Sequence, residues 1–213
     1  MPTAITVLGV DPGLTRCGLG VVRGPASRPS LVHLDCVRTH PDDPLESRLL
    51  AVHDAVLAAV AAHRPDAIAV ERVLFSSNVR TAMATGQSAG VALLAAARSG
   101  LPVTSYSPTD VKLTVAGSGA ADKDGVGRLV AAQLRLTEVP RPADVADALA
   151  VALTHLARSR LATAVAGTPA ADALAAAERS ARRTGRGGWE ARLAERGLTA
   201  SASSTRPRPK DVR

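Results

Sequence analysis

Four carboxylate side chains from three separate segments are the residues of this sequence whose type and spacing best suit chemistry. Asp11 and Glu71 each follow a short apolar run. Asp144 and Asp147 lie three residues apart and precede an almost unbroken apolar stretch. Carboxylate oxygens are hard ligands that suit Mg²⁺, which also keeps waters for a substrate phosphate. Two such ions about 4 Å apart can activate the attacking water and stabilise the leaving oxygen, so the pattern predicts metal-dependent phosphodiester hydrolysis.

Each of these acids also has an ordinary structural interpretation. Asp11 opens Asp-Pro-Gly, a good turn sequence, and Glu71 fits a solvated strand end. Asp144 suits a helix N-cap, where the helix dipole favours an acid. Asp147 lies further into a helix so apolar that it must be buried, which brings both acids close to the sheet. The catalytic interpretation therefore depends on all four acids meeting at one place.

The apolar patterning predicts an α/β domain that brings the acids together. We expect strands over residues 5–11, 16–22, 31–38, 67–71 and 101–106, and helices over 45–63, 78–98, 125–136 and 141–155, with another helix opening at Ser107-Pro108. The first two strands form an antiparallel hairpin. The strands that end at Asp11 and Glu71 are joined through a helix, so a right-handed crossover makes them parallel. Their carboxyl ends then share one edge of a mixed five-stranded sheet flanked by helices.

Composition and charge restrict the class of protein. The net charge of +7 lies wholly in residues 157–213, because residues 1–156 carry 14 basic and 14 acidic side chains. Three aromatic residues are too few for the stacking ladder of a single-strand binder. Cys17 and Cys36 have no metal-type spacing and are expected as buried thiols on neighbouring strands. With no signal peptide and no apolar run of membrane-spanning length, the sequence predicts a cytoplasmic protein.

The chain divides into a patterned region and a tail. Residues 1–157 are expected to form the α/β domain. Residues 158–213 are rich in Ala, Arg, Ser and Pro and are expected to be a largely disordered, basic tail. Two roles stay open for this tail, a purely solubilising one and a weak, salt-sensitive contact with phosphates.

Three short motifs resemble those of the RuvC crossover-junction endonucleases, in order, spacing and structural context. They are Gly9-Val-Asp11-Pro-Gly13, Ala69-Val-Glu71 and Ala143-Asp144-Val-Ala-Asp147-Ala-Leu-Ala150. The resemblance covers roughly residues 5–157 and implies an RNase H-like nuclease domain. It also implies that the four acids are the catalytic residues and the ligands of two Mg²⁺ ions, for which Mn²⁺ can substitute.

The same resemblance gives two lysines candidate roles in DNA binding. Lys112 and Lys123 fall where the family has basic residues important for activity and phosphate contact. The alternative for Lys112 is an ordinary exposed helix lysine, although it is one of only two lysines before the tail. Lys123 is expected in a polar loop, where the acids on both sides of it dilute its field.

Three further positions near the second acidic motif are candidate DNA contacts. The family often has an aromatic there that is thought to wedge into the junction. By strict count from Glu71 that position is Leu74, so Phe75 either acts from a shifted register or simply packs. Asn78 and Arg80, which both lie within the region that the resemblance covers, complete the set of candidate DNA contacts.

The resemblance implies a Mg²⁺-dependent, structure-selective endonuclease that resolves Holliday junctions. It would make symmetric paired nicks in two strands of like polarity and leave 5′-phosphate and 3′-hydroxyl ends. Two identical cuts match a two-fold homodimer, and the small-residue helix over residues 78–98 is the expected interface. Four-way junction DNA and the RuvA–RuvB branch-migration complex are the implied partners.

Three rival interpretations are weighed against it. A nucleotide-binding domain of the sugar kinase, Hsp70 and actin group fits Asp11-Pro-Gly13 but needs a second copy for which 213 residues are too few. A non-catalytic DNA-binding protein would use the basic tail and leaves the four carboxylates unexplained. Another RNase H-like nuclease, acting on a different structured nucleic acid, differs from a resolvase only through the family resemblance.

Overall fold

The computed structural model describes residues 4–73, 79–120 and 122–165, without the side chains of residues 123 and 160–165. Its elements, in chain order, are β1 (Ile5–Asp11), β2 (Arg16–Gly24), β3 (Ser30–Arg38), α1 (Leu45–His63), β4 (Ala67–Glu71), α2 (Val79–Arg98), β5 (Val103–Tyr106), α3 (Pro108–Ala116), α4 (Lys123–Leu134) and α5 (Ala143–Val165). The strands and most helix bounds agree with the patterning of the sequence.

The strands form one mixed sheet in the order β3-β2-β1-β4-β5. β1 pairs antiparallel with β2 and parallel with β4, and β4 continues parallel to β5. The predicted five-stranded mixed sheet is therefore confirmed, with the strand that carries Asp11 at its centre. Both neighbours of β1 hold it along its length, which fixes the position of its carboxyl end.

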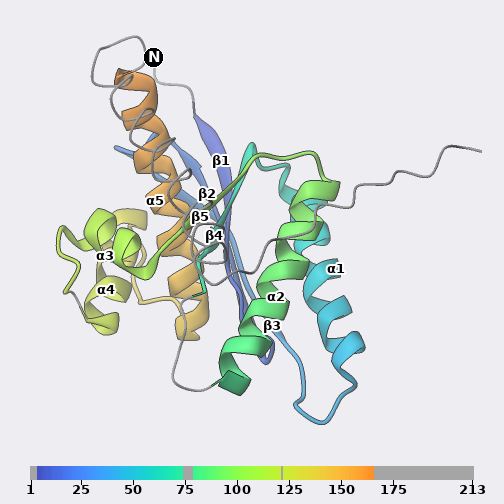
Figure 1. The fold of residues 1–213 in the computed structure, drawn as a ribbon. Helices are drawn as coiled ribbons and strands as arrows, with labels where there is room; N and C mark the ends of the chain where they lie inside the picture. The colour runs from blue at the N-terminus through green and yellow to red at the C-terminus, as the bar shows by residue number, and fades with distance from the viewer. Residues whose placement is uncertain (1–3, 74–78, 121, 166–213) are drawn as a thin grey trace, which may run out of the picture. The chain divides into compact units, whose positions relative to one another are not determined.

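Helices cover both faces of this sheet (Figure 1). α1 and α2 pack on one face over a core that includes Leu8, Leu19 and Ile68. α5 packs on the other face, with α3 and α4 beside it, over a core that includes Val7 and Leu149. Alternate residues of the same strands thus build two separate cores.

Two predicted details, and the structural alternative for Asp144, are wrong. Lys123 is the first residue of α4 rather than part of a loop, because the Asp122 carboxylate accepts a hydrogen bond from the Gly125 backbone and caps the helix. That helix also ends at Leu134, before a left-handed Arg135. Asp144 is the second residue of α5 rather than its N-cap, so its carboxylate is available for other contacts.

The chain forms two compact units, Met1–Thr163 and Ala164–Arg213. The first contains the whole sheet and α1 to α4, and α5 continues eight residues past the predicted end of the α/β domain at residue 157. The expected tail over 158–213 therefore begins within a helix, and its character from residue 166 onward stays a prediction, since those residues lie outside the described part.

Two further expectations concern the cysteines and the location of the protein. Cys17 is buried and Cys36 is partly buried, both as free thiols, on the neighbouring strands β2 and β3. Within the described residues, no helix has the length and apolarity that crossing a bilayer requires. The cytoplasmic location stays a prediction.

Candidate active site

The central pair of parallel strands brings the first two acids together. In the register of β1 and β4, Val10 is aligned with Val70, and Asp11 and Glu71 are the next residues of the two strands. Ala69 belongs to the core under α5, and side chains two residues apart in a strand point to the same face. Asp11 and Glu71 therefore lie at the same sheet edge and on the face that α5 covers.

Glycines on this face let α5 approach the sheet at backbone distance. A Cβ at Gly18 would overlap with the backbone oxygen of Asp144, and one at Gly9 would overlap with that of Ala148. Gly20 pairs with Gly9 in the sheet, and a Cβ added at Gly20 would lie 2.7 Å from the side chain of Leu149. The first turns of α5 consequently rest directly on β1 and β2, beside the end of the strand that carries Asp11.

The four acids lie close enough to interact strongly. The pKa of Asp11 is raised to about 9, first by burial and then by the charge of Glu71, a hydrogen bond with its side chain, and the charges of Asp147 and Asp144. Three carboxylates that act on the fourth must share one neighbourhood. The structure therefore brings together the four residues that the sequence predicted as catalytic, from β1, β4 and α5.

This donor set fits divalent cations. Carboxylate oxygens are the ligands that Mg²⁺ prefers. The carboxylates repel one another, which contributes to the raised pKa of Asp11, and a bound cation would relieve this repulsion. Oδ2 of Asp144 is buried and accepts no hydrogen bond, although Nε of Arg16 lies 2.9 Å away. Among the described residues, no three acidic, His or Cys side chains are already arranged around one point, and Asp144 is engaged by Arg16.

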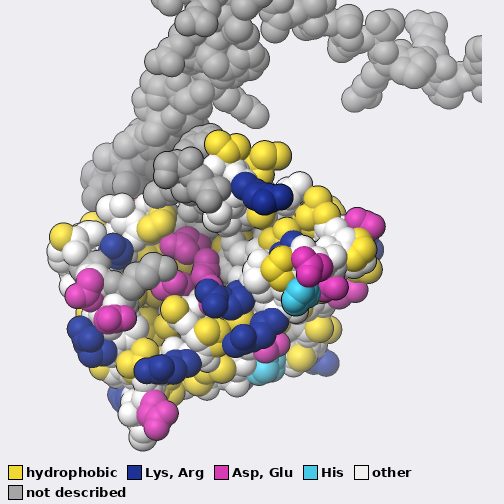
Figure 2. Space-filling model, turned by 90° about the horizontal axis from the view of Figure 1, so that it is seen from below, with side chains coloured by type: hydrophobic (Ala, Val, Ile, Leu, Met, Phe, Trp, Pro, Cys, Tyr) yellow, Lys and Arg dark blue, Asp and Glu magenta, His cyan; other side chains and the backbone are white. Residues whose placement is uncertain are grey.

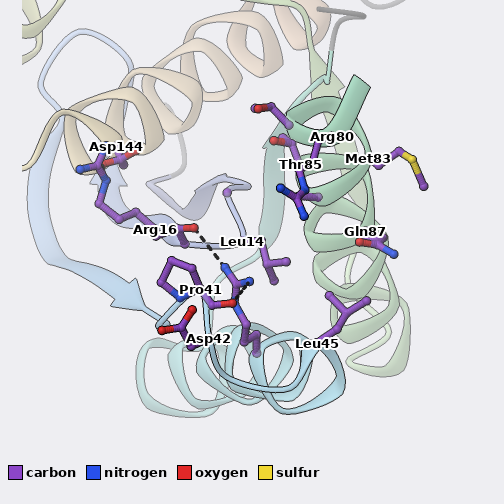
Figure 3. Close-up of a pocket in the computed structure, with 15 residues that line it drawn as sticks. Leu14, Arg16, Pro41, Asp42, Leu45, Arg80, Met83, Thr85, Gln87 and Asp144 are labelled. Carbon is purple, nitrogen blue, oxygen red and sulfur yellow. Dashed lines mark hydrogen bonds and ion pairs between the residues drawn. The ribbon is translucent and has the colours of Figure 1, made fainter. Parts of the chain in front are cut away.

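Two open hollows flank the acids, and both carry arginines. The α2-side hollow has a volume of about 1030 Å³, is lined by Arg16, Arg48 and Arg80, and reaches Asp144. Figure 3 shows Arg16 and Asp144 on one side of it and Arg80 of α2 on the other.

The α4-side hollow lies at the other acid of α5. It has a volume of about 820 Å³, is lined by Arg38, Arg128 and Arg141, and reaches Asp147. Figure 2 shows acidic side chains gathered in a depression of the surface, with basic side chains around them. The acids of α5 thus face two different arginine-lined surfaces.

Lys112 lies at the acidic site. It lines a cavity of about 60 Å³ together with Glu71 and Asp147. Its helix, α3, is capped by Ser107, whose hydroxyl accepts a hydrogen bond from the backbone of Asp110. Lys112 is therefore a half-buried helix lysine next to two of the acids, and its role in DNA binding stays a prediction.

An ion pair ties this helix to α5. Nη2 of Arg158 lies 2.7 Å from Oδ1 of Asp110, and the guanidinium lies over the ring of Tyr106 at 5.4 Å from its centre. The Tyr106 hydroxyl in turn hydrogen-bonds to Nδ1 of His155 at 3.0 Å. α3 is therefore held against β5 and α5, the elements next to the acids.

The other candidate DNA contacts are placed unequally. Arg80 is exposed and lines the α2-side hollow, close to the acids. Phe75 and Asn78 lie outside the described residues, and so does the side chain of Lys123. Their predicted roles, like those of the four acids, stay predictions.

Sequence reasoning named Arg80 but missed the other arginines of both hollows. Apart from Arg80 they carry no motif, and Arg38, Arg128 and Arg141 are far apart along the chain. Arg16 offered a signal, because it follows Asp11-Pro-Gly13 and opens the strand that pairs with the one carrying Asp11. A basic side chain in that position must lie near the carboxyl end of β1.

Comparison with known proteins gives a consistent result. A family described as "Crossover junction endodeoxyribonuclease RuvC" matches residues 7–155. Among curated relatives of that name, the protein of Salinispora arenicola is 56% identical over 163 residues, which cover 74% of this chain and 93% of the relative. The protein of Rhodococcus opacus is 49% identical over 190 residues, covering 89% of this chain and 95% of the relative.

A solved structure agrees with these relatives. The structure of Thermus thermophilus RuvC in complex with a Holliday junction substrate superposes with a TM-score of 0.72 at 41% identity. The match covers 75% of this chain and 97% of the other. The similarity therefore extends over nearly the whole of that protein, and the family match over residues 7–155 includes all four acids.

Proposed function

This chain belongs to the RuvC family of crossover junction endodeoxyribonucleases, and from that premise we propose that it resolves Holliday junctions by Mg²⁺-dependent cleavage at Asp11, Glu71, Asp144 and Asp147. The observation that carries this proposal is the juxtaposition of four carboxylates between two arginine-lined hollows. Carboxylates alone would repel a DNA backbone, whereas arginines beside them attract it.

Two Mg²⁺ ions held by the four carboxylates would supply an activated water for attack and would stabilise the negative charge on the leaving oxygen. The protein's own contribution is to hold the four side chains on rigid elements and to orient the phosphodiester. Attack on phosphorus with breakage of the bond to O3′ leaves a 5′-phosphate and a 3′-hydroxyl. Lys112, at the cavity shared with Glu71 and Asp147, would add a positive charge next to the reacting phosphate.

The hollows suggest how a DNA strand crosses the site. Asp144 opens onto the α2-side hollow and Asp147 onto the α4-side hollow. A strand whose scissile phosphate lies at the acids would place flanking phosphates against Arg80 on one side and Arg128 on the other. These contacts do not read bases, so they favour a backbone of the right shape over a particular sequence.

Cleavage of a labelled four-way junction tests the proposal, with a linear duplex of matched sequence as the control. We expect paired symmetric nicks in the junction with Mg²⁺ or Mn²⁺, ligatable ends, and no cleavage with EDTA or in Asp11→Asn. A junction that is bound but never cut under any divalent cation would favour the non-catalytic DNA-binding alternative. Equal cutting of the duplex would instead favour a different RNase H-like nuclease.

We further propose that the protein acts as a homodimer through α2. The exposed apolar residues of this helix recur at helical spacing along one stripe, which includes Val79, Met83, Leu93 and Leu94. At Gly86 and Gly90, between them, an added Cβ would meet no atom within 4 Å. A stripe of this kind that no other described part of the chain covers suits self-association on a two-fold axis, which would present two identical sites to the junction.

Light scattering coupled to size-exclusion chromatography tests the dimer. Met83→Asp should convert a dimer into a monomer, whereas Leu50→Asp, an equally exposed apolar position on α1, should leave it intact. A wild-type monomer at micromolar concentration would refute the proposal. Association with a RuvA–RuvB complex is part of the same proposal by family resemblance, and co-elution with those proteins on a junction would test it.

A further inference from the structure

The ion pair between Arg16 and Asp144 has no part in the proposed chemistry and even opposes it. Nε of Arg16 lies 2.9 Å from Oδ2 of Asp144. The guanidinium therefore competes with a divalent cation for the same carboxylate oxygen. The Asp144 side chain is 21% exposed and that of Arg16 is 55% exposed, so the carboxylate is the more fixed partner. In the free protein, one of the four acids is therefore paired with the guanidinium of Arg16.

The contact is close in distance but is not a formed hydrogen bond. Oδ2 of Asp144 is buried and lacks an aligned donor. A buried acceptor without a donor is costly, so the oxygen gains by meeting a better-placed cation. The pair is consequently one that a divalent ion can displace.

A hydrogen-bonded network fixes the backbone that precedes Arg16. Arg48 of α1 donates from Nη2 to the Thr15 hydroxyl at 3.0 Å and from Nε to the Thr39 hydroxyl at 2.9 Å. The Thr39 hydroxyl donates to the backbone oxygen of Leu14 at 2.6 Å. The backbone on the N-terminal side of Arg16 is thus fixed to α1, and the Arg16 side chain lines the α2-side hollow beside Asp144 (Figure 3).

We propose that Arg16 is a positioning residue that exchanges partners during the reaction cycle, an inference that rests on the proposed function. In the free protein it neutralises Asp144 and lowers the affinity of the site for divalent cations. When cations bind, Arg16 is released into the α2-side hollow, where Arg48 and Arg80 already line the wall, and pairs with a phosphate of the bound strand. Metal and DNA then each favour the binding of the other. The cation frees Arg16 by binding Asp144, and the DNA phosphate frees Asp144 by binding Arg16.

Metal binding without DNA tests the first half of the exchange. Free Mn²⁺ is followed by electron paramagnetic resonance during titration of wild-type protein, Arg16→Gln, Arg16→Lys and the control Arg80→Gln. Arg80 lines the same hollow, so its loss removes the same charge from that surface. Removing a cation in contact with the carboxylate should tighten Mn²⁺ binding by about five- to tenfold in Arg16→Gln. Arg80→Gln should change it less than about twofold, and Arg16→Lys should stay near wild type.

Junction binding tests the second half. In Ca²⁺, which occupies oxygen sites, we measure the affinity of the same variants for a four-way junction as a function of salt. Arg16→Gln should bind the junction several-fold more weakly, with a salt slope reduced by about one phosphate contact. Arg16→Lys should recover most of this affinity. Melting of each metal-free variant shows that it is folded.

The outcomes separate this proposal from its premise. Equal or weaker Mn²⁺ binding by Arg16→Gln would overturn the exchange and leave Arg16 as a residue that only orients Asp144. Unchanged junction affinity and salt slope would also overturn it. If wild-type protein binds no Mn²⁺, the proposed metal site itself fails and this inference fails with it.

Discussion

The two faces of the central sheet are built from the same strands but in opposite ways. On the face covered by α1 and α2, the inward residues are large, as at Leu8, Leu19 and Ile68, and side chains fill the space between sheet and helices. On the face covered by α5, glycines stand at Gly9 and Gly18, and helix backbone contacts strand backbone. Both faces bury an apolar core, but the α5 face also omits side chains at the positions where the start of a helix reaches the end of a strand.

This difference shows how the site is assembled. The acids of α5 can reach Asp11 only because nothing stands between the helix and the sheet. Bringing the acids together has a cost, since burial and the charge of Glu71 are the main causes that raise the pKa of Asp11 to about 9. The α5 face therefore carries this cost at the acidic site, and the apolar cores on both faces of the sheet stabilise the domain against it.

The largest expected effect is on the chemistry at the α5 face. Asp11→Asn should lower junction cleavage by about 10³-fold or more, because it removes a central metal ligand while keeping the shape of the side chain. Gel assays under single-turnover conditions measure this loss. Asp35→Asn, an exposed acid of β3, is the control and should cleave like wild type. Cleavage by Asp11→Asn within tenfold of wild type would contradict the four-acid site.

A change in the size of one buried side chain on each face tests the difference between the faces. Gly18→Ala should destabilise the protein by about 3 kcal/mol or more and impair cleavage, because the new Cβ overlaps with the backbone of Asp144. Val56→Ala, on the buried side of α1 at the other face, should cost about 2 kcal/mol yet retain cleavage at temperatures where it is folded. Urea unfolding and junction cleavage are measured for both. Normal cleavage by folded Gly18→Ala would show that close helix approach is not required.

Lys112 should affect the reaction more than the binding. Lys112→Gln should reduce the cleavage rate by about 10- to 100-fold, because a positive charge beside the acids stabilises charge that develops in the transition state. Junction affinity in Ca²⁺ should change by less than about threefold. Lys112→Arg keeps the charge and should restore most of the rate, and its failure to do so would indicate a requirement for the shape of lysine.

Because the acids are concentrated on the α5 face, the free energy of unfolding should depend on pH. Burial, followed by the neighbouring carboxylates, raises the pKa of Asp11 from 3.8 to about 9 in the folded protein, so the unfolded chain releases this proton first as pH rises. The metal-free protein should therefore lose stability between about pH 4 and 9. Asp11→Asn should melt about 3–6 °C higher than wild type near pH 8, and the difference should vanish near pH 4. A constant difference across this range would contradict the assignment.

Much of this architecture could be read from the sequence, for identifiable reasons. Leu45–His63 and Ala67–Glu71 were predicted residue for residue, because apolar periodicity is strong there and Arg64-Pro65-Asp66 breaks the chain between them. The meeting of Asp11 and Glu71 followed from one crossover rule. Local patterns of this kind need no knowledge of distant packing.

The parts that sequence could not supply depend on distant contacts. Lys123 was placed in a loop because neighbouring polar residues mask a helix start that the cap at Asp122 creates. The continuation of α5 to Val165 was missed because the segment beyond residue 157 has little apolar patterning. The ion pair of Arg16 with Asp144 joins residues 128 positions apart, and the sequence gives no periodic signal for such a contact.

The direct contact of α5 with the strands at Gly9 and Gly18 has a consequence for behaviour with temperature. Side chains between two elements change rotamers as a protein warms, and the spacing they set expands with that freedom. Contacting backbones have no such freedom, so the separation of Asp144 from the end of β1 should change little on heating until the domain itself unfolds. The dimensions of the acidic site are thereby set by the thickness of the main chain.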